Sequence, residues 1–239
     1  IWLIFVPLMV ATTVLAGLTC LLLIPFLPAE KVAKLSAIPW AKLCLLYSGV
    51  RVEVHGRHHL LPGQSYVIVA NHLSQFDIFV LYGYLGVDFR WVMKHELRKI
   101  PVIGICCEKL GHVFINRDTT EAAIASLNEA RARLANGASV LFFPEGTRSR
   151  DGQLKPFKKG AFKMAQDLHM PVLPVTLSGT FDILPAGTLR LHPGATARLI
   201  LHPPLTVTGH SDTELQTLVR QSRAAIATPL SDSCPQPSL

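Results

Sequence analysis

The chain has 239 residues, of which 49% are hydrophobic and only 16% are charged, and its formal net charge is +7. That length suits one domain with its own core plus an appendage, and the five cysteines, with no C-x-x-C pair, argue against a disulfide framework or a zinc site. The basic excess suits anionic lipid headgroups or phosphorylated substrates, whereas the lack of a dense Lys/Arg run and of a binding motif argues against nucleic acid as a partner. A scattered basic surface that only aids solubility is the alternative.

The apolar residues are concentrated at the front of the chain, where residues 1–29 carry no charged side chain. About 20 apolar residues are enough to cross a bilayer, so residues 1–27 form a candidate membrane helix. A cleaved signal peptide is the alternative, but its apolar region spans only about 7 to 15 residues. We therefore expect residues 1–48 to form a membrane-associated helical segment that either spans the bilayer or only enters it.

A second segment, residues 32–47, is amphipathic, with Lys34 and Lys42 among its apolar residues. Such a helix can lie among lipid headgroups with its lysines at the phosphates, and a core helix packed on the domain is the alternative. Lysines after an apolar run also favour the cytoplasmic side. We therefore expect the following domain on the cytoplasmic face of the inner (plasma) membrane.

Short apolar runs alternate with helical patterns over residues 49–227, which predicts one α/β domain with a mostly parallel or mixed sheet flanked by helices. The helix expected over 118–136 has the clearest signals, a capping box at Asp118 and a stop at Gly137. Residues 228–239 are expected to form a flexible tail. The other expected helices are 77–85, 159–168 and 213–227, and the expected strands are 50–54, 66–70, 89–93, 113–115, 140–143, 172–177 and 197–201.

Polar clusters follow three of the expected strands. Ligands of α/β sheets gather at the carboxyl ends of parallel strands, so parallel strands would bring all three clusters to one cleft. The clusters are Asn71-His72, Asn116-Arg117 and Glu145-Gly146-Thr147-Arg148, after the strands at 66–70, 113–115 and 140–143.

His72 and Asp77 form a candidate acid–base pair. An imidazole titrates near neutrality and can take a proton from a hydroxyl, and a carboxylate on its other nitrogen orients it and stabilises the imidazolium. A five-residue offset does not place two side chains on one helix face. The pair therefore meets only if His72 lies in a turn and Asp77 in the helix that follows. Taken alone the pattern is weak, and a turn residue or helix cap is the alternative for His72.

The remaining candidates suit an anionic or polyol substrate. Arg117, ahead of an expected helix, can grip a phosphate together with backbone N–H groups, although a surface ion pair is the alternative. Glu145 can accept hydrogen bonds from a polyol, and Gly146 permits a tight turn whose N–H groups can support an oxyanion. Basic stretches that include Lys94 and Lys158 suit a headgroup or the phosphates of a donor, with solvated charge as the alternative.

Several catalytic signatures are absent from the sequence. It contains no G-x-S-x-G, Walker A, G-x-G-x-x-G or H-E-x-x-H pattern, so it gives no support for a serine acyl-enzyme, a nucleotide site or a zinc protease. Direct attack by a substrate hydroxyl, with His72 as base, is the simplest chemistry left.

Four blocks in order resemble the motifs of the glycerolipid acyltransferase family. They are N-H-x4-D at 71–77, F-I-N-R at 114–117, F-P-E-G-T-R-S at 143–149 and a proline-containing apolar block at 172–175. Each block is weak singly, and the four together, over about a hundred residues, are highly specific. The family's N-terminal helical membrane motif also matches residues 1–48.

The resemblance implies transfer of a fatty acyl group from acyl-CoA or acyl-carrier protein to the sn-2 hydroxyl of 1-acyl-glycerol-3-phosphate, a lysophospholipid acceptor, giving phosphatidate. It implies His72 as base, Asp77 as its orienting carboxylate and Arg117 as the phosphate ligand, with no metal or bound cofactor. Other lysophospholipids or glycerol-3-phosphate as acceptor, lipid hydrolysis and non-catalytic membrane lipid binding are the alternatives. Further substrate-binding residues are expected to be Asn116, Glu145, Gly146, Thr147, Arg148, Lys94 and Lys158.

Overall fold

The computed structural model of the chain describes residues 2–116, 119, 125–126 and 138–231. Most of the helix expected over 118–136 lies outside the described residues, and so do Arg117 and the last part of the expected tail, 232–239.

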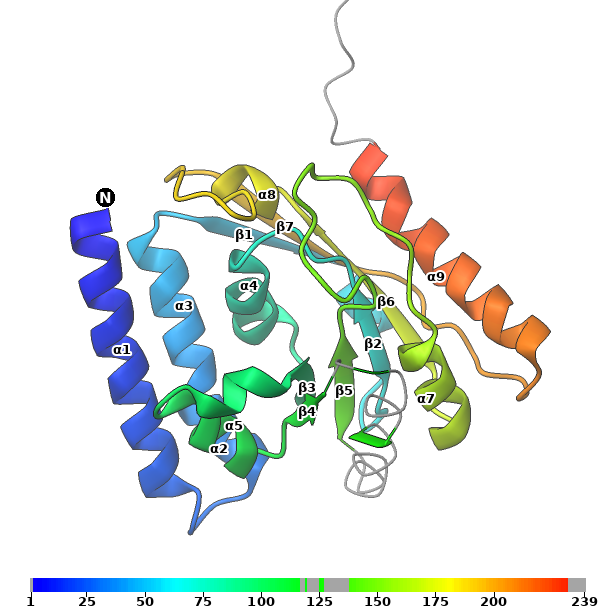
Figure 1. The fold of residues 1–239 in the computed structure, drawn as a ribbon, viewed down its shortest axis with the longest axis horizontal. Helices are drawn as coiled ribbons and strands as arrows, with labels where there is room; N and C mark the ends of the chain where they lie inside the picture. Colours follow the sequence, from blue (N-terminus) through cyan, green and yellow to red (C-terminus); the bar gives the residue numbers. More distant parts are fainter. Residues whose placement is uncertain (1, 117–118, 120–124, 127–137, 232–239) are drawn as a thin grey trace, which may run out of the picture.

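A seven-stranded sheet forms the centre of the molecule, in the order β1-β7-β6-β2-β5-β3-β4 (Figure 1). Strands β6, β2, β5, β3 and β4 run parallel, β7 is antiparallel to β6, and β1 is parallel to β7. The expected mixed, mostly parallel sheet is confirmed, and every expected strand agrees within one residue at each end. The strands are β1 Arg51–His55, β2 Val67–Ala70, β3 Phe89–Lys94, β4 Val113–Ile115, β5 Ser139–Phe142, β6 Val172–Ser178 and β7 Thr196–Leu201.

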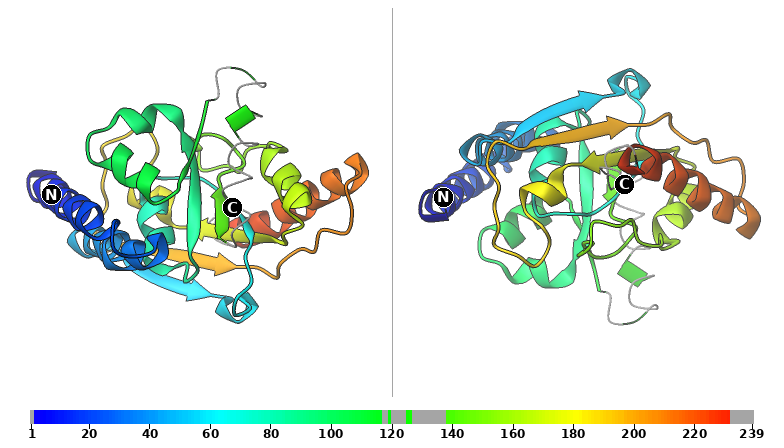
Figure 2. Two further views of the ribbon diagram at one scale, coloured as in Figure 1. Left: turned by 90° about the horizontal axis from the view of Figure 1, so that it is seen from below. Right: turned by 90° about the horizontal axis from the view of Figure 1, so that it is seen from above.

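Helices cover both faces of the sheet. Figure 1 shows α1, α3 and α4 on one side and α7 and α9 on the other, and Figure 2 shows α1 and α9 at opposite ends of the molecule. Because both faces are covered, all four residues of β2 are buried and apolar. The helices are α1 Trp2–Leu23, α2 Ala29–Leu35, α3 Ala37–Tyr47, α4 Phe76–Tyr84, α5 Ile103–Lys109, α7 Gly160–Leu168, α8 Thr180–Ile183 and α9 Asp212–Ser231, with 3₁₀ helices at Arg57–His59 and His95–Lys99.

The segment at 32–47, expected as one helix, is two helices that break at Ser36. Pro39 explains the break, because its ring would clash with the carbonyl of Leu35 in a continuous helix, whereas the first turn of a new helix tolerates proline. Ala41 and Leu45 of α3 are buried in the core. This segment is therefore a core helix, the alternative left open above, and not a helix lying free among headgroups.

Helix α1 is attached to the domain along its length. Near its start the buried Phe5 stacks on Phe76 of α4 with ring centroids 6.0 Å apart. Midway, the indole N–H of Trp40 donates to Thr13 Oγ1 at 2.8 Å. Further on, the buried Gly17 packs against α5. Helix α1 is thus a packed layer of the domain with one outward face.

Three further elements differ from expectation. The short helices α5 and α8 were not predicted, since neither is long enough to show a helical period. Helix α9 runs to Ser231, four residues beyond the expected end at 227, so residues 228–231 are helical where a loose tail was expected.

Candidate active site

The parallel strands β2, β5, β3 and β4 end at one edge of the sheet, and this edge carries the candidate residues. His72 follows β2, Phe143 follows β5, Lys94 ends β3 and Asn116 follows β4. Neighbouring strands are in register there, with Lys94 opposite Ile115. The expectation that the three clusters meet at one edge holds for their described members.

His72 and Asp77 meet as the turn-and-helix arrangement predicts. His72 lies in the turn between β2 and α4, and Asp77 is the second residue of α4. The Nδ1 atom of His72 lies 2.8 Å from Oδ2 of Asp77. The Asp77 side chain is fully buried, whereas the His72 side chain is 15% exposed. The imidazole is therefore reachable from outside while its carboxylate partner is not.

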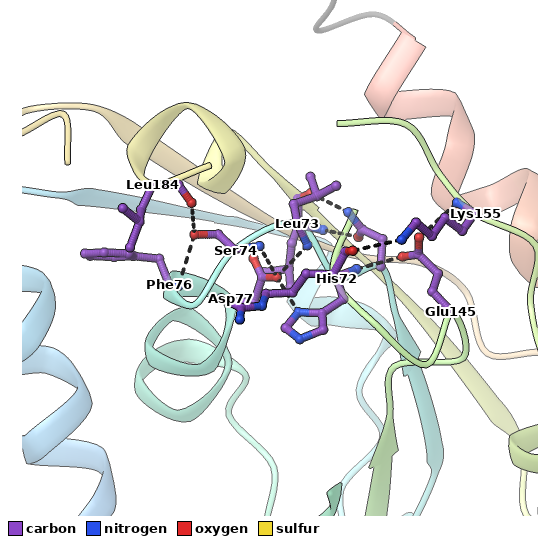
Figure 3. Close-up of polar contacts among 11 residues, drawn as sticks. His72, Leu73, Ser74, Phe76, Asp77, Glu145, Lys155 and Leu184 are labelled. Atoms are coloured by element: carbon purple, nitrogen blue, oxygen red, sulfur yellow. Dashed lines mark hydrogen bonds and ion pairs between the residues drawn. The ribbon is translucent and has the colours of Figure 1, made fainter. Parts of the chain in front are cut away.

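Asp77 also organises the turn that carries His72 (Figure 3). Its Oδ2 accepts hydrogen bonds from the backbone N–H groups of Leu73 at 2.7 Å and Ser74 at 2.8 Å. Its buried Oδ1 has no hydrogen-bond partner among the described residues. One carboxylate oxygen thus fixes both the backbone of the turn and the imidazole.

Two further side chains tie this turn to neighbouring elements, Asn71 to strand β6 and Ser74 to the end of α8. The amide of Asn71 donates to the Leu177 carbonyl at 2.8 Å and accepts from the Leu177 N–H at 2.7 Å. The hydroxyl of Ser74 donates to the Leu184 carbonyl at 2.7 Å. Asn71 is completely buried, so it joins β2 to β6 and does not line the approach to His72.

The F-P-E-G-T-R-S block surrounds His72 from the neighbouring strand β5. The ring of Phe143 stacks on the imidazole with centroids 3.8 Å apart and planes 7° apart. The carboxylate of Glu145 accepts the backbone N–H of His72 at 2.8 Å through Oε1 and the backbone N–H of Lys155 at 2.9 Å through Oε2. The Ser149 N–H donates to the His72 carbonyl at 2.8 Å. Burial raises the pKa of Glu145, and the two backbone N–H donors oppose that rise.

Gly146 adopts the tight turn that the sequence predicts, with a φ of +78°. Its N–H donates to the Phe143 carbonyl at 2.9 Å, and the Lys158 side chain lies against it. The N–H groups of Gly146 and Ser149 are therefore engaged within the protein, which differs from the sequence hypothesis that this turn offers its N–H groups to an oxyanion.

Cationic side chains stand at the same edge. Lys94 pairs with Glu96 at 2.6 Å, and both are about half exposed. The Lys155 ammonium donates to the Arg148 carbonyl at 2.9 Å. Thr147, Arg148 and Lys158 are exposed, whereas Asn116 is half-buried. Arg117, the expected phosphate ligand, lies outside the described residues.

An aromatic layer lies beneath His72, and the sequence analysis did not predict it. Trp91 packs against Phe143 with ring centroids 5.6 Å apart. Nδ1 of His112 accepts the backbone N–H of Trp91 at 3.2 Å, and Nε2 of the same imidazole lies 2.6 Å from the Tyr82 hydroxyl. Burial lowers the pKa of His112 to about 3. These residues lie on separate elements with no shared motif, so no local signal could have grouped them.

No metal centre is found in the part of the chain that the structure describes, because no three His, Cys, Asp or Glu side chains lie together suitably.

Comparison with known proteins places this geometry in context. The family model described as Acyltransferase matches residues 51–178. A chloroplastic 1-acyl-sn-glycerol-3-phosphate acyltransferase from Brassica napus is 37% identical over 167 residues, covering 70% of this chain and 48% of that protein. The alpha form of the same named enzyme from Mus musculus is 32% identical, covering 78% of this chain and 67% of that protein. The chain spans about half the length of the first curated relatives it matches.

A solved structure is similar over nearly the whole chain. The 1-acyl-sn-glycerophosphate (LPA) acyltransferase PlsC from Thermotoga maritima has a TM-score of 0.81 and 29% sequence identity. The match covers 99% of this chain and 96% of that one. The helical N-terminal segment and the α/β domain are thus both included in the likeness.

Proposed function

The chain belongs to the acyltransferase family, and on that premise we propose that it transfers a fatty acyl group to the sn-2 hydroxyl of 1-acyl-glycerol-3-phosphate, giving phosphatidate. The observation that carries the proposal is the 2.8 Å contact between the partly exposed imidazole of His72 and the buried carboxylate of Asp77. The relatives named above, which are 1-acyl-sn-glycerol-3-phosphate acyltransferases, support this choice of acceptor.

His72 acts as the general base in this proposal. Asp77 holds Nδ1, and within the described chain Nε2 has no hydrogen-bond partner. Nε2 takes the proton of the acceptor hydroxyl as its oxygen attacks the carbonyl carbon of the acyl thioester. The tetrahedral intermediate collapses, the carbon–sulfur bond breaks, and the imidazolium returns the proton to the leaving thiolate. Asp77 stabilises the imidazolium between these steps.

The cationic residues at the sheet edge bind the phosphate of the acceptor. Arg117 follows β4 directly after Asn116, and Lys94 ends the adjacent strand β3. Arg148 and Lys158 come from the segment after β5, where Gly146 and Thr147 adjoin the glycerol group. A dianionic phosphate is well served by such a set of guanidinium and ammonium donors.

The donor is acyl-CoA or acyl-carrier protein. A thioester is already activated toward attack by a hydroxyl, so the chain's own residues have only to orient the two reactants and move one proton. No metal or bound cofactor is needed for that sequence of steps.

Membrane lipid is the third partner in this proposal. Helix α1 is long and apolar enough to cross a bilayer by length and composition, but its attachment to the domain through Phe5, Thr13 and Gly17 favours a position along the membrane surface. The lysines of α2 favour the anionic cytoplasmic leaflet of the inner membrane. The outward face of α1 carries the exposed residues Leu3, Ile4, Val10, Leu15, Leu18 and Leu22.

An acyl-transfer assay tests the proposed function. The full chain is given acyl-CoA or acyl-carrier protein with a panel of lysolipids, and the products are identified by mass. We expect phosphatidate from 1-acyl-glycerol-3-phosphate, no product from His72→Ala with the fold retained, and a higher KM for that acceptor in Arg117→Ala. Release of fatty acid without an acceptor would point instead to a hydrolase, and lipid binding without thioester consumption to a binding protein.

A further inference from the structure

We propose that Glu145 is a positioning residue that holds His72 in its reactive place, and not a ligand of the acceptor's glycerol group. The inference rests on the proposed function, since it takes His72 as the base. It differs from the role that the family resemblance implies for Glu145.

Both carboxylate oxygens of Glu145 already accept a hydrogen bond inside the protein. The residue is only 4% exposed. Oε1 accepts the His72 N–H at 2.8 Å and Oε2 accepts the Lys155 N–H at 2.9 Å. Because the residue is almost inaccessible, a glycerol hydroxyl could reach a remaining lone pair only if the surrounding segment moved, and any buried N–H left unpaired by that movement would be costly. Glu145 is therefore poorly placed to bind a substrate and well placed to bind the backbone of His72.

Glu145 completes a clamp on His72 that comes from one segment. The N–H of His72 bonds Glu145, its carbonyl accepts the Ser149 N–H at 2.8 Å, and its ring stacks on Phe143. Figure 3 shows His72 between Asp77 on one side and Glu145 on the other. Asp77 fixes the direction of the ring, and the segment after β5 fixes the peptide that carries it.

The two sides of this clamp belong to neighbouring strands. His72 follows β2, Glu145 follows β5, and these strands pair in parallel with Val69 opposite Phe142. The hydrogen bond from His72 to Glu145 thus fixes the position of the His72 backbone, and with it the imidazole, relative to strand β5. A base displaced by about 1 Å loses about a hundredfold in rate, so this contact controls turnover without touching either substrate.

The contact also needs a carboxylate rather than an amide. Two N–H donors face two oxygens, and an amide has only one acceptor and would set its NH₂ group against the other N–H. Glu145→Gln therefore keeps the volume of the side chain but breaks one half of the bridge between the His72 and Lys155 peptides.

Steady-state kinetics of Glu145→Gln and Glu145→Ala test the proposal. We expect kcat to fall about 10- to 100-fold while KM for 1-acyl-glycerol-3-phosphate changes by less than about twofold. Glu53→Gln is the matched control, because Glu53 is an exposed carboxylate of β1 paired with Arg198. A raised KM with unchanged kcat in Glu145→Gln would overturn the proposal and restore a substrate-binding role.

Hydrogen exchange measured by mass spectrometry gives a second readout that needs no activity. Peptides covering residues 71–77 are expected to exchange faster in Glu145→Gln than in the original chain or in Glu53→Gln, as His72 loses its acceptor. Equal exchange in all three would overturn the proposal. If the original chain and Glu53→Gln transfer no acyl group, the proposed function fails, and the exchange result still decides whether Glu145 holds His72. Circular dichroism shows whether Glu145→Gln is folded. If Glu145→Gln does not fold, Glu145→Asp, which keeps both carboxylate oxygens on a shorter side chain, takes its place in both measurements.

Discussion

His72 is bound at Nδ1 by Asp77, and the same Asp77 oxygen accepts two backbone N–H groups of the turn. Three donors therefore converge on one oxygen, while the other oxygen, Oδ1, has no partner among the described residues. This asymmetry separates the two functions of the carboxylate, since an amide oxygen can accept the three donors but cannot stabilise an imidazolium by charge.

Asp77→Asn is expected to lower kcat by on the order of 10²-fold, because the ring keeps its orientation but loses the charge that stabilises its protonated form. Asp77→Ala should cost more, because the N–H groups of Leu73 and Ser74 also lose their acceptor. The comparison is made on kcat with saturating acceptor and donor. Equal losses in the two variants would show that orientation and charge are not separable here.

His112 gives the fold a dependence on pH. Its folded-state pKa of about 3 lies below the value of about 6.5 for an unfolded histidine. Between these values the unfolded chain binds a proton that the folded chain excludes. The stability that the neutral His112 contributes is therefore fully present above about pH 6.5 and is lost as the pH falls toward 3.

We expect His112 to remove on the order of 1 kcal/mol of unfolding free energy per pH unit within that window. Denaturant unfolding of the original chain and of His112→Gln at pH 7, 6 and 5 measures it. The difference between the two chains should shrink as the pH falls, because only the original chain carries the titrating group. A constant difference would mean that this imidazole is protonated in the fold or does not titrate.

Among the helices, α1 and α5 pack closely through one glycine. A Cβ atom on Gly17 would lie 2.1 Å from a methyl carbon of Val102, and the Cys106 thiol lies 3.5 Å from the Gly17 carbonyl. Val102 has a φ of +65°, which is rare for a β-branched residue, so it has little freedom to give way. The fit between these helices therefore depends on the absence of a side chain at position 17.

Gly17→Ala should destabilise the fold by about 1–3 kcal/mol through this overlap. Gly83→Ala in α4 is the matched control, since its Cβ would meet Lys42 at an ordinary 3.4 Å, and alanine there should be neutral or stabilising by up to about 1 kcal/mol. Thermal unfolding of both variants in the same detergent measures the difference. Equal midpoints would show that α1 and α5 separate readily.

Over the whole molecule, the outward face of α1 and the sheet edge that carries the candidate site belong to one packed body. We expect such a helix, held by α3, α4 and α5, to lie in the interface, because crossing a bilayer would draw polar parts of the domain into the hydrocarbon. A helix in the interface, by contrast, inserts its apolar face by only about 5–10 Å.

Depth measurements by fluorescence quenching distinguish these positions. A fluorophore is placed in turn at Leu3, Leu15 and Leu22, all exposed on α1, and is quenched by lipids labelled at known depths. We expect similar shallow depths at the three sites. In a helix that crosses the bilayer, Leu15 would lie near the centre of a core about 30 Å thick, far below the two ends.

The strands and the contact between His72 and Asp77 were predictable from the sequence because both are encoded locally. Apolar runs and turn residues define each strand to within one residue, and a histidine in a turn five residues before a helical aspartate can meet it without help from elsewhere. Pro39 carried a local signal as well, and it accounts for the break between α2 and α3.

Only the tertiary structure decided which segments distant in the sequence contact these local elements. Whether Glu145 meets a substrate or the peptide of His72, and whether α3 lies on lipid or in the core, depends on segments that approach from other strands and helices. A carboxylate has the same acceptors in either setting, so its role follows from which donors folding brings to it, and that is a property of packing and not of the residue.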